Sequence, residues 1–225
     1  MLCVSTTGDA PATVTAFKWV PPFAQGFVRD LRIRWALEEA GLPYEIELIG
    51  PETTASEGYR QWQPFGQVPA YRDDAVEIFE SGAILVHLAA KSEALAPADP
   101  AGRARVTTWI ISGLNSVEPF AQNLATLDSF HTGQPWVEGY RPVARAALEK
   151  RLTSLSKWLG DKAWLEGRFT AGDIIMVTVL RELVNCGILK AFPNLDAYRA
   201  RGEARPAFAK ALADQLKTFA ENAPA

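Results

Sequence analysis

The stretch QPFGQVPAYRDDAVEIFESG, residues 63–82, decides how this chain is interpreted. Two short apolar runs, VPAY and AVEIF, flank the polar segment 72–74, and this pattern predicts a β-hairpin with a polar turn. Pro69 lies inside the first run, although proline cannot donate a hydrogen bond to a β-ladder. Glu80 and Ser81 follow the second run directly and precede an apolar segment with helical spacing. An acid and a hydroxyl therefore stand at the predicted start of a helix.

The residues before the hairpin predict a strand, a helix and a second strand. Residues 13–20 read as a strand that ends at two prolines, and residues 28–41 carry apolar side chains spaced three and four apart, as on one face of a helix. The segment YEIELIG alternates with the period of a strand, and residues 56–65 form a polar connection with room for a short helix. The order strand–helix–strand favours parallel pairing through a right-handed crossover.

Beyond the hairpin the strand patterns end and helical patterns take over. Residues 92–100 are polar with two prolines and are interpreted as a linker between a domain at 12–91 and an all-helical domain at 101–225. Within the second domain, Thr170 stands three residues before Asp173 at the head of an apolar run, which predicts a capping box.

Composition excludes several classes of function. The 225 residues carry a net charge of −3, which gives no electrostatic reason to expect nucleic acid or an anionic membrane as a partner. No apolar run reaches the roughly 18 residues of a membrane span, and the first residues resemble a polar leader. The two cysteines, Cys3 and Cys186, form no disulfide framework, so a cytoplasmic setting is expected. His87 and His131 have no ligand cluster around them, so no metal site is predicted.

The hairpin and the helix after it suit a ligand with a peptide backbone. A cis Val68–Pro69 bond at the start of a strand would turn the Val68 N–H and C=O outward, where an extended peptide can pair with them. The helix start at Ser81 suits a carboxylate, because helix N-termini offer free N–H groups and partial positive charge. Glu80 suits an ammonium group. Both groups together form the head of an α-amino acid, so we expect a short peptide here.

The order βαβ–ββα, the segments GQVP and ES of the opening stretch, and TAGD at 170–173 together resemble the cytosolic glutathione S-transferases. The resemblance covers nearly the whole chain from about Thr13. It implies a thioredoxin-like α/β N-terminal domain, an all-α C-terminal domain and, usually, a homodimer. It also implies glutathione as co-substrate, with its cysteinyl part at the valine and proline and its γ-glutamyl head at the Glu-Ser pair. The residues implied in glutathione binding are Gln67, Val68, Pro69, Glu80 and Ser81.

The chain departs from the family where the glutathione thiol is activated. Family members place a Tyr, Ser or Cys near the end of the first strand, because the thiolate is the nucleophile. Aligned through the segment LRIRWALEEAGLPYE, those three positions fall near Phe23, Phe27 and Arg29. No Ser, Thr, Tyr or Cys occurs between Val20 and Gly41.

Three hypotheses follow from this departure. In the first, the helix N-terminus near residues 26–29, with Arg29 and Gln25, stabilises the thiolate. In the second, the protein binds glutathione conjugates or other apolar ligands without chemistry. In the third, the fold serves assembly. The first hypothesis gives a transferase that conjugates glutathione to an apolar small electrophile, as in detoxification, with a glutathione-dependent peroxidase or lyase as an alternative.

The electrophile pocket is expected between the two domains. The loop after the first strand and the first long helix of the second domain should wall it, because such pockets are mostly apolar. Arg32 and Arg34 are expected to be surface or domain-interface charges. The predicted pocket residues are Phe23, Phe27, Trp109 and Leu114.

Overall fold

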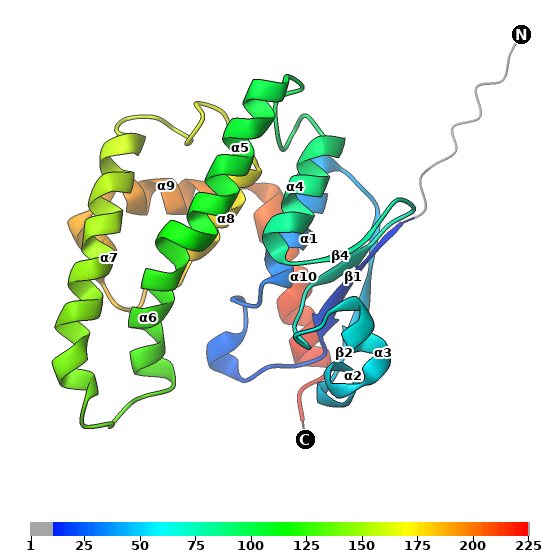
Figure 1. The fold of residues 1–225 in the computed structure, drawn as a ribbon, viewed down its shortest axis with the longest axis horizontal. Coiled ribbons are helices and arrows are strands. Elements are labelled where there is room, and N and C mark those ends of the chain that lie inside the picture. The colour runs from blue at the N-terminus through cyan, green and yellow to red at the C-terminus, as the bar shows by residue number, and fades with distance from the viewer. Residues whose placement is uncertain (1–10, 225) are drawn as a thin grey trace, which may run out of the picture.

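The computed structural model describes residues 11–224, so the polar leader and Cys3 lie outside the described residues. A sheet with its helices forms the first part, and a wholly helical part follows (Figure 1). The first part contains β1 (Ala12–Phe17), the 3₁₀ turn η1 (Pro22–Ala24), α1 (Asp30–Ala40), β2 (Tyr44–Ile49), α2 (Pro51–Ala55), α3 (Glu57–Trp62), β3 (Ala70–Arg72), β4 (Glu77–Phe79) and α4 (Ser81–Lys91). The second contains α5 (Pro100–Ser112), the π-helical turn η2 (Gly113–Val117), α6 (Glu118–Ser129), α7 (Val137–Leu159), α8 (Ala171–Arg181), the 3₁₀ turn η3 (Ile188–Ala191), α9 (Pro193–Glu203) and α10 (Pro206–Glu221).

The sheet has the strand order β2-β1-β3-β4. β1 pairs parallel to β2 and antiparallel to β3, and β3 pairs antiparallel to β4. Successive side chains of a strand point to opposite faces. Val14 belongs to the large core that includes α1 and α4, whereas the hydroxyl of Thr15 meets Tyr59 of α3 on the other face. The predicted βαβ–ββα order and its thioredoxin-like arrangement are confirmed.

Several boundaries differ from the sequence predictions. β1 ends at Phe17 rather than Val20, because the chain turns toward the two prolines after residue 18. Pro69 lies one residue before β3 instead of inside it, so its missing N–H removes no ladder bond. The connection at residues 56–65 contains the short helix α3, a second short helix, α2, precedes it, and the first helix of the second part already begins at Pro100.

The predicted capping box at the start of α8 is present. The Thr170 N–H donates to Asp173 Oδ2 at 2.9 Å, and the Thr170 hydroxyl accepts from the Gly172 N–H at 3.3 Å. Asp173 is buried and also accepts from Tyr198 Oη at 2.8 Å. Tyr198 lies on α9, a helix that the sequence analysis did not predict. The box therefore fixes the helix start and also ties α8 to α9.

One continuous hydrophobic core joins the two parts of the molecule. Trp35 of α1 is fully buried, and its ring lies 5.7 Å from that of Phe169 and 4.9 Å from that of Phe208. Because these aromatic contacts cross from the sheet part to the helical part, the surfaces that face each other between the parts are held in place. Within residues 11–224, no helix has the length and apolar character needed to cross a bilayer.

Candidate functional site

Buried polar side chains fix the loop before β3 through hydrogen bonds to its backbone. The Gln67 N–H donates to Gln63 Oε1 at 3.2 Å, and the Gln67 C=O accepts from Tyr59 Oη at 2.6 Å. Tyr59 Oη also lies 2.9 Å from the buried Thr15 hydroxyl. The Val68–Pro69 bond is cis. The N–H and C=O of Val68 make no hydrogen bond with any residue that the structure describes, so this one backbone unit stays free to pair with a ligand.

Val68 and Ser81 lie at the same end of the β3–β4 hairpin. In the β3–β4 ladder Ala70 pairs with Phe79. Val68 precedes Ala70 by two residues, and Ser81 follows Phe79 by two residues, just beyond the last pair of the ladder. Ser81 is buried and begins α4, whose first turn has no side-chain cap. An unpaired backbone unit and an uncapped helix start therefore lie at the same end of the hairpin.

Glu80, between β4 and α4, has an unusual backbone conformation. Its φ is +70°, and no other non-glycine residue in the described part of the chain has a positive φ. Such a conformation typically costs about 1–3 kcal/mol and tends to persist at binding sites. The side chain of Glu80 is exposed and does not cap α4. An exposed carboxyl group that does not cap α4 therefore stands next to Ser81 in the chain.

A buried ion network connects this helix start with the helical part. Arg32 donates to Ser81 Oγ at 3.3 Å, to Thr178 Oγ1 at 3.0 Å and to Glu118 Oε1 at 2.6 Å. The same Glu118 oxygen accepts from Arg29 at 3.2 Å. The side chains of Arg32 and Glu118 are only 3% and 4% exposed. Arg32 is thus one of the domain-interface charges considered from the sequence. Because the Ser81 oxygen accepts a hydrogen bond from Arg32, the Ser81 hydroxyl proton remains available to donate to another group.

The loop before α1 places the two predicted thiolate-stabilising side chains differently. Gln25 donates its amide to the Val20 C=O at 3.0 Å, so this donor is already engaged within the loop. Arg29 is partly exposed, and its charge is balanced by Glu118. The N–H groups of Val28 and Arg29 make no hydrogen bond with another described residue. The backbone at the start of α1 therefore offers anion-binding donors that the two side chains do not.

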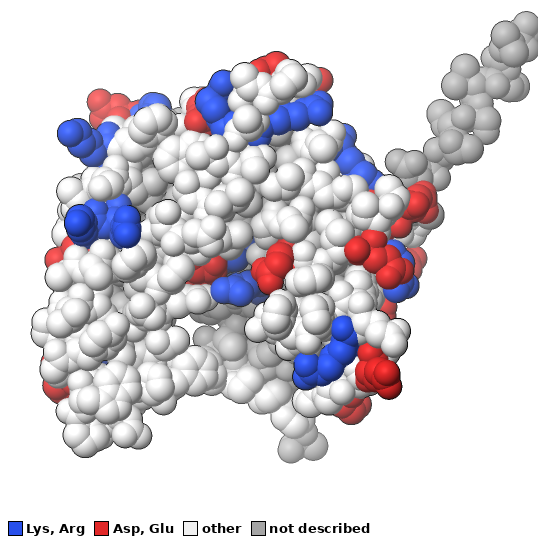
Figure 2. All heavy atoms as spheres, in the orientation of Figure 1, with Lys and Arg blue, Asp and Glu red and all other residues white. Residues whose placement is uncertain are grey.

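A cavity of about 380 Å³ lies beside this loop. Figure 2 shows the hollow between the helical part and the sheet part, with charged groups of both signs at its inner end. Phe23 and Phe27 line the cavity, and Phe23 packs edge-on against Phe130 at 5.6 Å. The lining also includes the polar side chains of Gln122, Asn185 and Glu182. The cavity therefore offers an aromatic wall at Phe23 and Phe27 together with hydrogen-bonding groups.

The structure does not bring the other two predicted pocket residues to this cavity. Trp109 lines a separate cavity of about 200 Å³ within the helical part, where its ring lies 5.4 Å from that of Trp158 and its Nε1 donates to Glu166 at 2.8 Å. Leu114 packs over Gly82, where an added Cβ would lie 2.4 Å from Leu114 Cδ1. Helical spacing alone did not reveal which face of α5 Trp109 occupies, nor that Leu114 lies in the π-helical turn η2.

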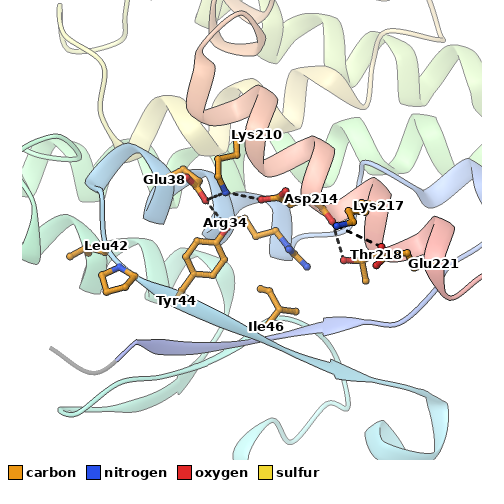
Figure 3. Close-up of a pocket in the computed structure, with 11 residues that line it drawn as sticks. Arg34, Glu38, Leu42, Tyr44, Ile46, Lys210, Asp214, Lys217, Thr218 and Glu221 are labelled. Atoms are coloured by element: carbon orange, nitrogen blue, oxygen red, sulfur yellow. Dashed lines mark hydrogen bonds and ion pairs between the residues drawn. The ribbon is translucent and has the colours of Figure 1, made fainter. Parts of the chain in front are cut away.

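A larger cavity of about 530 Å³ lies between α1, β2 and α10 (Figure 3). Its charged side chains are largely paired with one another; for example, Lys210 contacts both Glu38 and Asp214. Arg34 lines this cavity, whereas Arg32 belongs to the ion network described above. Residues two apart on a helix point to different faces. The larger cavity is therefore separated by α1 from the site at the hairpin.

Glu182, at the C-terminal end of α8, has an unusual electrostatic environment. Its pKa is raised from the ordinary 4.5 to about 7, chiefly by burial and also by the neighbouring Glu118, while Arg32, Arg29 and Arg181 act in the opposite direction. Its closest cationic atom is Arg32 Nη2, at 3.9 Å, and its carboxyl group makes no hydrogen bond within the described chain. The pKa of this carboxyl group therefore lies close to neutral pH.

Sequence reasoning missed several residues of this site. Gln63 and Tyr59 were read only as part of a polar connection, and Glu118 and Glu182 were read only as parts of helical runs. A charged residue within an apolar helical run was the one available signal for the two glutamates. No group of three or more potential metal-ligating side chains occurs among residues 11–224.

Comparisons with known proteins point in one direction. Residues 13–90 match the family model described as the N-terminal domain of glutathione S-transferase. Glutathione S-transferase GstA of Escherichia coli O157:H7 is 31% identical over 191 residues, which cover 80% of this chain and 92% of that protein. Hematopoietic prostaglandin D synthase of Gallus gallus is 30% identical over 203 residues, which cover 82% of this chain and 90% of that protein.

Solved structures with the same fold include bacterial proteins that hold glutathione. A glutathione transferase of Burkholderia graminis, with two glutathione molecules per subunit, is 25% identical with a TM-score of 0.75, and the match covers 90% of this chain and 87% of that one. A family member from Pseudomonas fluorescens, with two glutathione bound, has a TM-score of 0.78 over 93% of this chain and 95% of that one. At 24% identity, the second likeness bears on the fold alone.

Proposed function

Because this chain belongs to the glutathione S-transferase family, we propose that it binds glutathione at the hairpin and conjugates the glutathione thiolate to an apolar small electrophile. The observation that supports the proposal is that the unpaired Val68 backbone and the uncapped start of α4 lie at the same end of the β3–β4 hairpin. The cysteinyl unit of glutathione would pair with Val68, beside Gln67 and Pro69. The Ser81 hydroxyl and the N–H groups of the first turn of α4 would hold the γ-glutamyl carboxylate, and Glu80 would hold its ammonium group.

Activation of sulfur in this proposal relies on the backbone more than on side chains. The thiolate is the reactive form, and it needs hydrogen-bond donors or positive charge nearby. The unpaired N–H groups of Val28 and Arg29 supply donors at the N-terminus of α1. The Arg29 charge contributes less than the sequence alone suggested, because Glu118 balances it, and Gln25 contributes only after leaving Val20.

The electrophile would occupy the cavity beside Phe23 and Phe27, with its apolar part on the aromatic wall. The division into residues 12–91, 92–100 and 101–225 and the homodimer usual in the family are also proposals. Neither is needed for the site as described, because the hairpin, α4 and the ion network all lie within one chain.

Calorimetric titration with glutathione tests the binding step. Ser81→Ala removes a hydrogen bond to a charged group, which is typically worth 1.5–3 kcal/mol, so the Kd should rise by about 10- to 100-fold. The matched control is Ser92→Ala at the other end of α4, which should leave the Kd within about threefold. Equal affinities in both variants and the unaltered protein would refute the placement of the γ-glutamyl group.

A second candidate function is a glutathione- or ligand-binding protein without chemistry. The observation that favours it is the lack of any Ser, Thr, Tyr or Cys between Val20 and Gly41. Thiolate absorbance of bound glutathione against pH separates the two candidates. A pKa well below that of free glutathione supports the transferase, whereas an unchanged pKa at saturating protein supports the binding protein.

A further inference from the structure

Glu182 differs from every other group that lines the aromatic cavity. It is the only acidic or basic side chain on that cavity wall among the residues that the structure describes. Its side chain is 17% exposed, so the carboxyl group is mostly shielded yet reaches the cavity. It also lines a small void that touches the turn of Gly26, Phe27 and Val28, just before α1. Glu182 thus lies between the cavity and the backbone donors assigned above to the thiolate.

Two glutamates share two arginines here, and the sharing is unequal. Glu118 accepts hydrogen bonds from both Arg29 and Arg32, whereas Glu182 accepts from neither. From its own helix, Arg181 directs its guanidinium to Glu203 and the Gly26 C=O instead. The two acids therefore have different environments: two arginines hydrogen-bond Glu118, whereas Glu182 is mostly buried without a hydrogen-bonding cation, and burial raises the pKa of Glu182.

We propose that Glu182 is the general acid of this site and that the preferred substrates are aryl-bearing electrophiles that become oxyanions when sulfur adds to them. This inference rests on the function proposed above. An aryl epoxide or an aryl-substituted enone has the required chemistry. Its ring would lie against Phe23 and Phe27, and its oxygen would face Glu182.

The proton and electron balance is simple for both substrates. A carbon–sulfur bond forms from the thiolate electron pair. In the epoxide the C–O bond breaks, and in the enone the C=C electrons move toward the carbonyl, so in both cases oxygen receives an electron pair. The Glu182 carboxyl group gives its proton to that oxygen and becomes a carboxylate near Arg32. Water at the cavity mouth then returns a proton to Glu182.

The pH dependence follows from the groups that face Glu182. Arg29 and Arg32 of α1 and Arg181 of α8 favour the carboxylate, whereas Glu118 and burial favour the acid, and the balance leaves the pKa near 7. Catalysis by the acid form is lost as the pH rises above that value, while the thiolate is lost as the pH falls. A bell-shaped profile is therefore expected for oxyanion-forming substrates.

The test compares electrophiles that need a proton with one that does not. Styrene oxide and 4-phenyl-3-buten-2-one are the probes, and 1-chloro-2,4-dinitrobenzene is the reference because it expels chloride. In the full-length protein, Glu182→Gln should lower the ratio of kcat/KM for a probe to that for the reference at least tenfold, and it should remove the alkaline limb of the probe's profile. Glu149→Gln, the same change at an exposed ion pair on α7, should keep the ratio within about threefold.

Each outcome decides something. Turnover of the reference with an unchanged ratio in Glu182→Gln would overturn the role of Glu182 and leave the transferase intact. Turnover of the reference but of neither probe would overturn the substrate class. No turnover of any electrophile would refute the proposed function and this inference together. Turnover of one probe only would support the inference and identify which oxyanion, alkoxide or enolate, the site produces.

Discussion

Replacing Arg32 with methionine tests how the two parts of the molecule are coupled at the site. Methionine keeps much of the length and apolar volume of the arginine stem but removes the guanidinium group. The three hydrogen bonds from Arg32 to Ser81, Thr178 and Glu118 would be lost together. Glu118 is almost fully buried, and it would keep its contacts with Arg29 at 3.2 Å and with the Gln122 side-chain amide at 3.4 Å.

The magnitude follows from the charge left behind. Removing one partner of a buried ion pair typically destabilises a protein by 3–5 kcal/mol, because the remaining charge is poorly solvated. Arg29 offsets part of this for Glu118, so we expect the free energy of unfolding to fall by about 3 kcal/mol in Arg32→Met. Adding Glu118→Gln removes the stranded charge, so the double variant should recover about 1–2 kcal/mol of that loss.

Urea unfolding followed by tryptophan fluorescence at pH 7 measures both variants. The comparison is valid where the m-values agree, since a changed m-value signals a different unfolding reaction. Arg145→Met, at an exposed i,i+4 pair on α7, is the control and should change stability by less than about 0.5 kcal/mol. A loss below about 1 kcal/mol in Arg32→Met, or no recovery in the double variant, would refute the reasoning.

Three further changes test separate features. Glu80→Gly should raise the free energy of unfolding by about 1 kcal/mol, because glycine adopts the positive φ without strain, and it should weaken glutathione binding. The control Glu77→Gly, within β4, should lower the free energy of unfolding. Urea unfolding measures the stability of each variant, and calorimetry measures its glutathione binding. Glu182→Gln should become more stable than the unaltered protein as the pH rises from 4.5 through 7, and the difference should approach about 3 kcal/mol. The reason is that the raised pKa makes ionisation of Glu182 costly in the folded state of the unaltered protein. Unfolding free energies of the two proteins that do not diverge with pH would contradict this. Thr170→Ala should lower stability by about 1–2 kcal/mol because it removes the cap of α8. Thermal melts measure this loss, with Thr153→Ala at an exposed position of α7 as the control.

The fold was predictable because its local patterns agree with one another. Alternating and helical spacing gave the βαβ–ββα order, and the Thr170–Asp173 spacing gave the capping box. Boundaries were less predictable, since the end of β1 depends on which residues find a partner on β2. α9 was missed because its charged sequence has almost no apolar stripe; its place is set by Tyr198 reaching Asp173 on a neighbouring helix.

The candidate site was predictable only where one local segment supplies it. The hairpin and the start of α4 are contiguous in sequence, so Val68 and Ser81 could be assigned to one site from the pattern of residues 63–82. The ion network joins residues 86 positions apart, as between Arg32 and Glu118, and no periodicity encodes such a contact. Trp109 lines a different cavity from the predicted one, because its neighbours Glu166 and Trp158 come from distant parts of the chain.

The bound thiol and Glu182 should titrate as coupled groups, since both depend on the same arginines. With Glu182 protonated, Arg29 and Arg32 outnumber the single charge of Glu118, and a net positive charge remains near the proposed thiolate. Ionisation of Glu182 near pH 7 cancels that excess, which should raise the pKa of the bound thiol and make the two titrations depend on each other. Glu182→Gln keeps the positive excess at every pH, so its bound glutathione should show a lower thiol pKa than the unaltered protein, measured by thiolate absorbance. An equal thiol pKa in both proteins would mean that the backbone donors at the start of α1, and not the arginine charges, set the reactivity of sulfur.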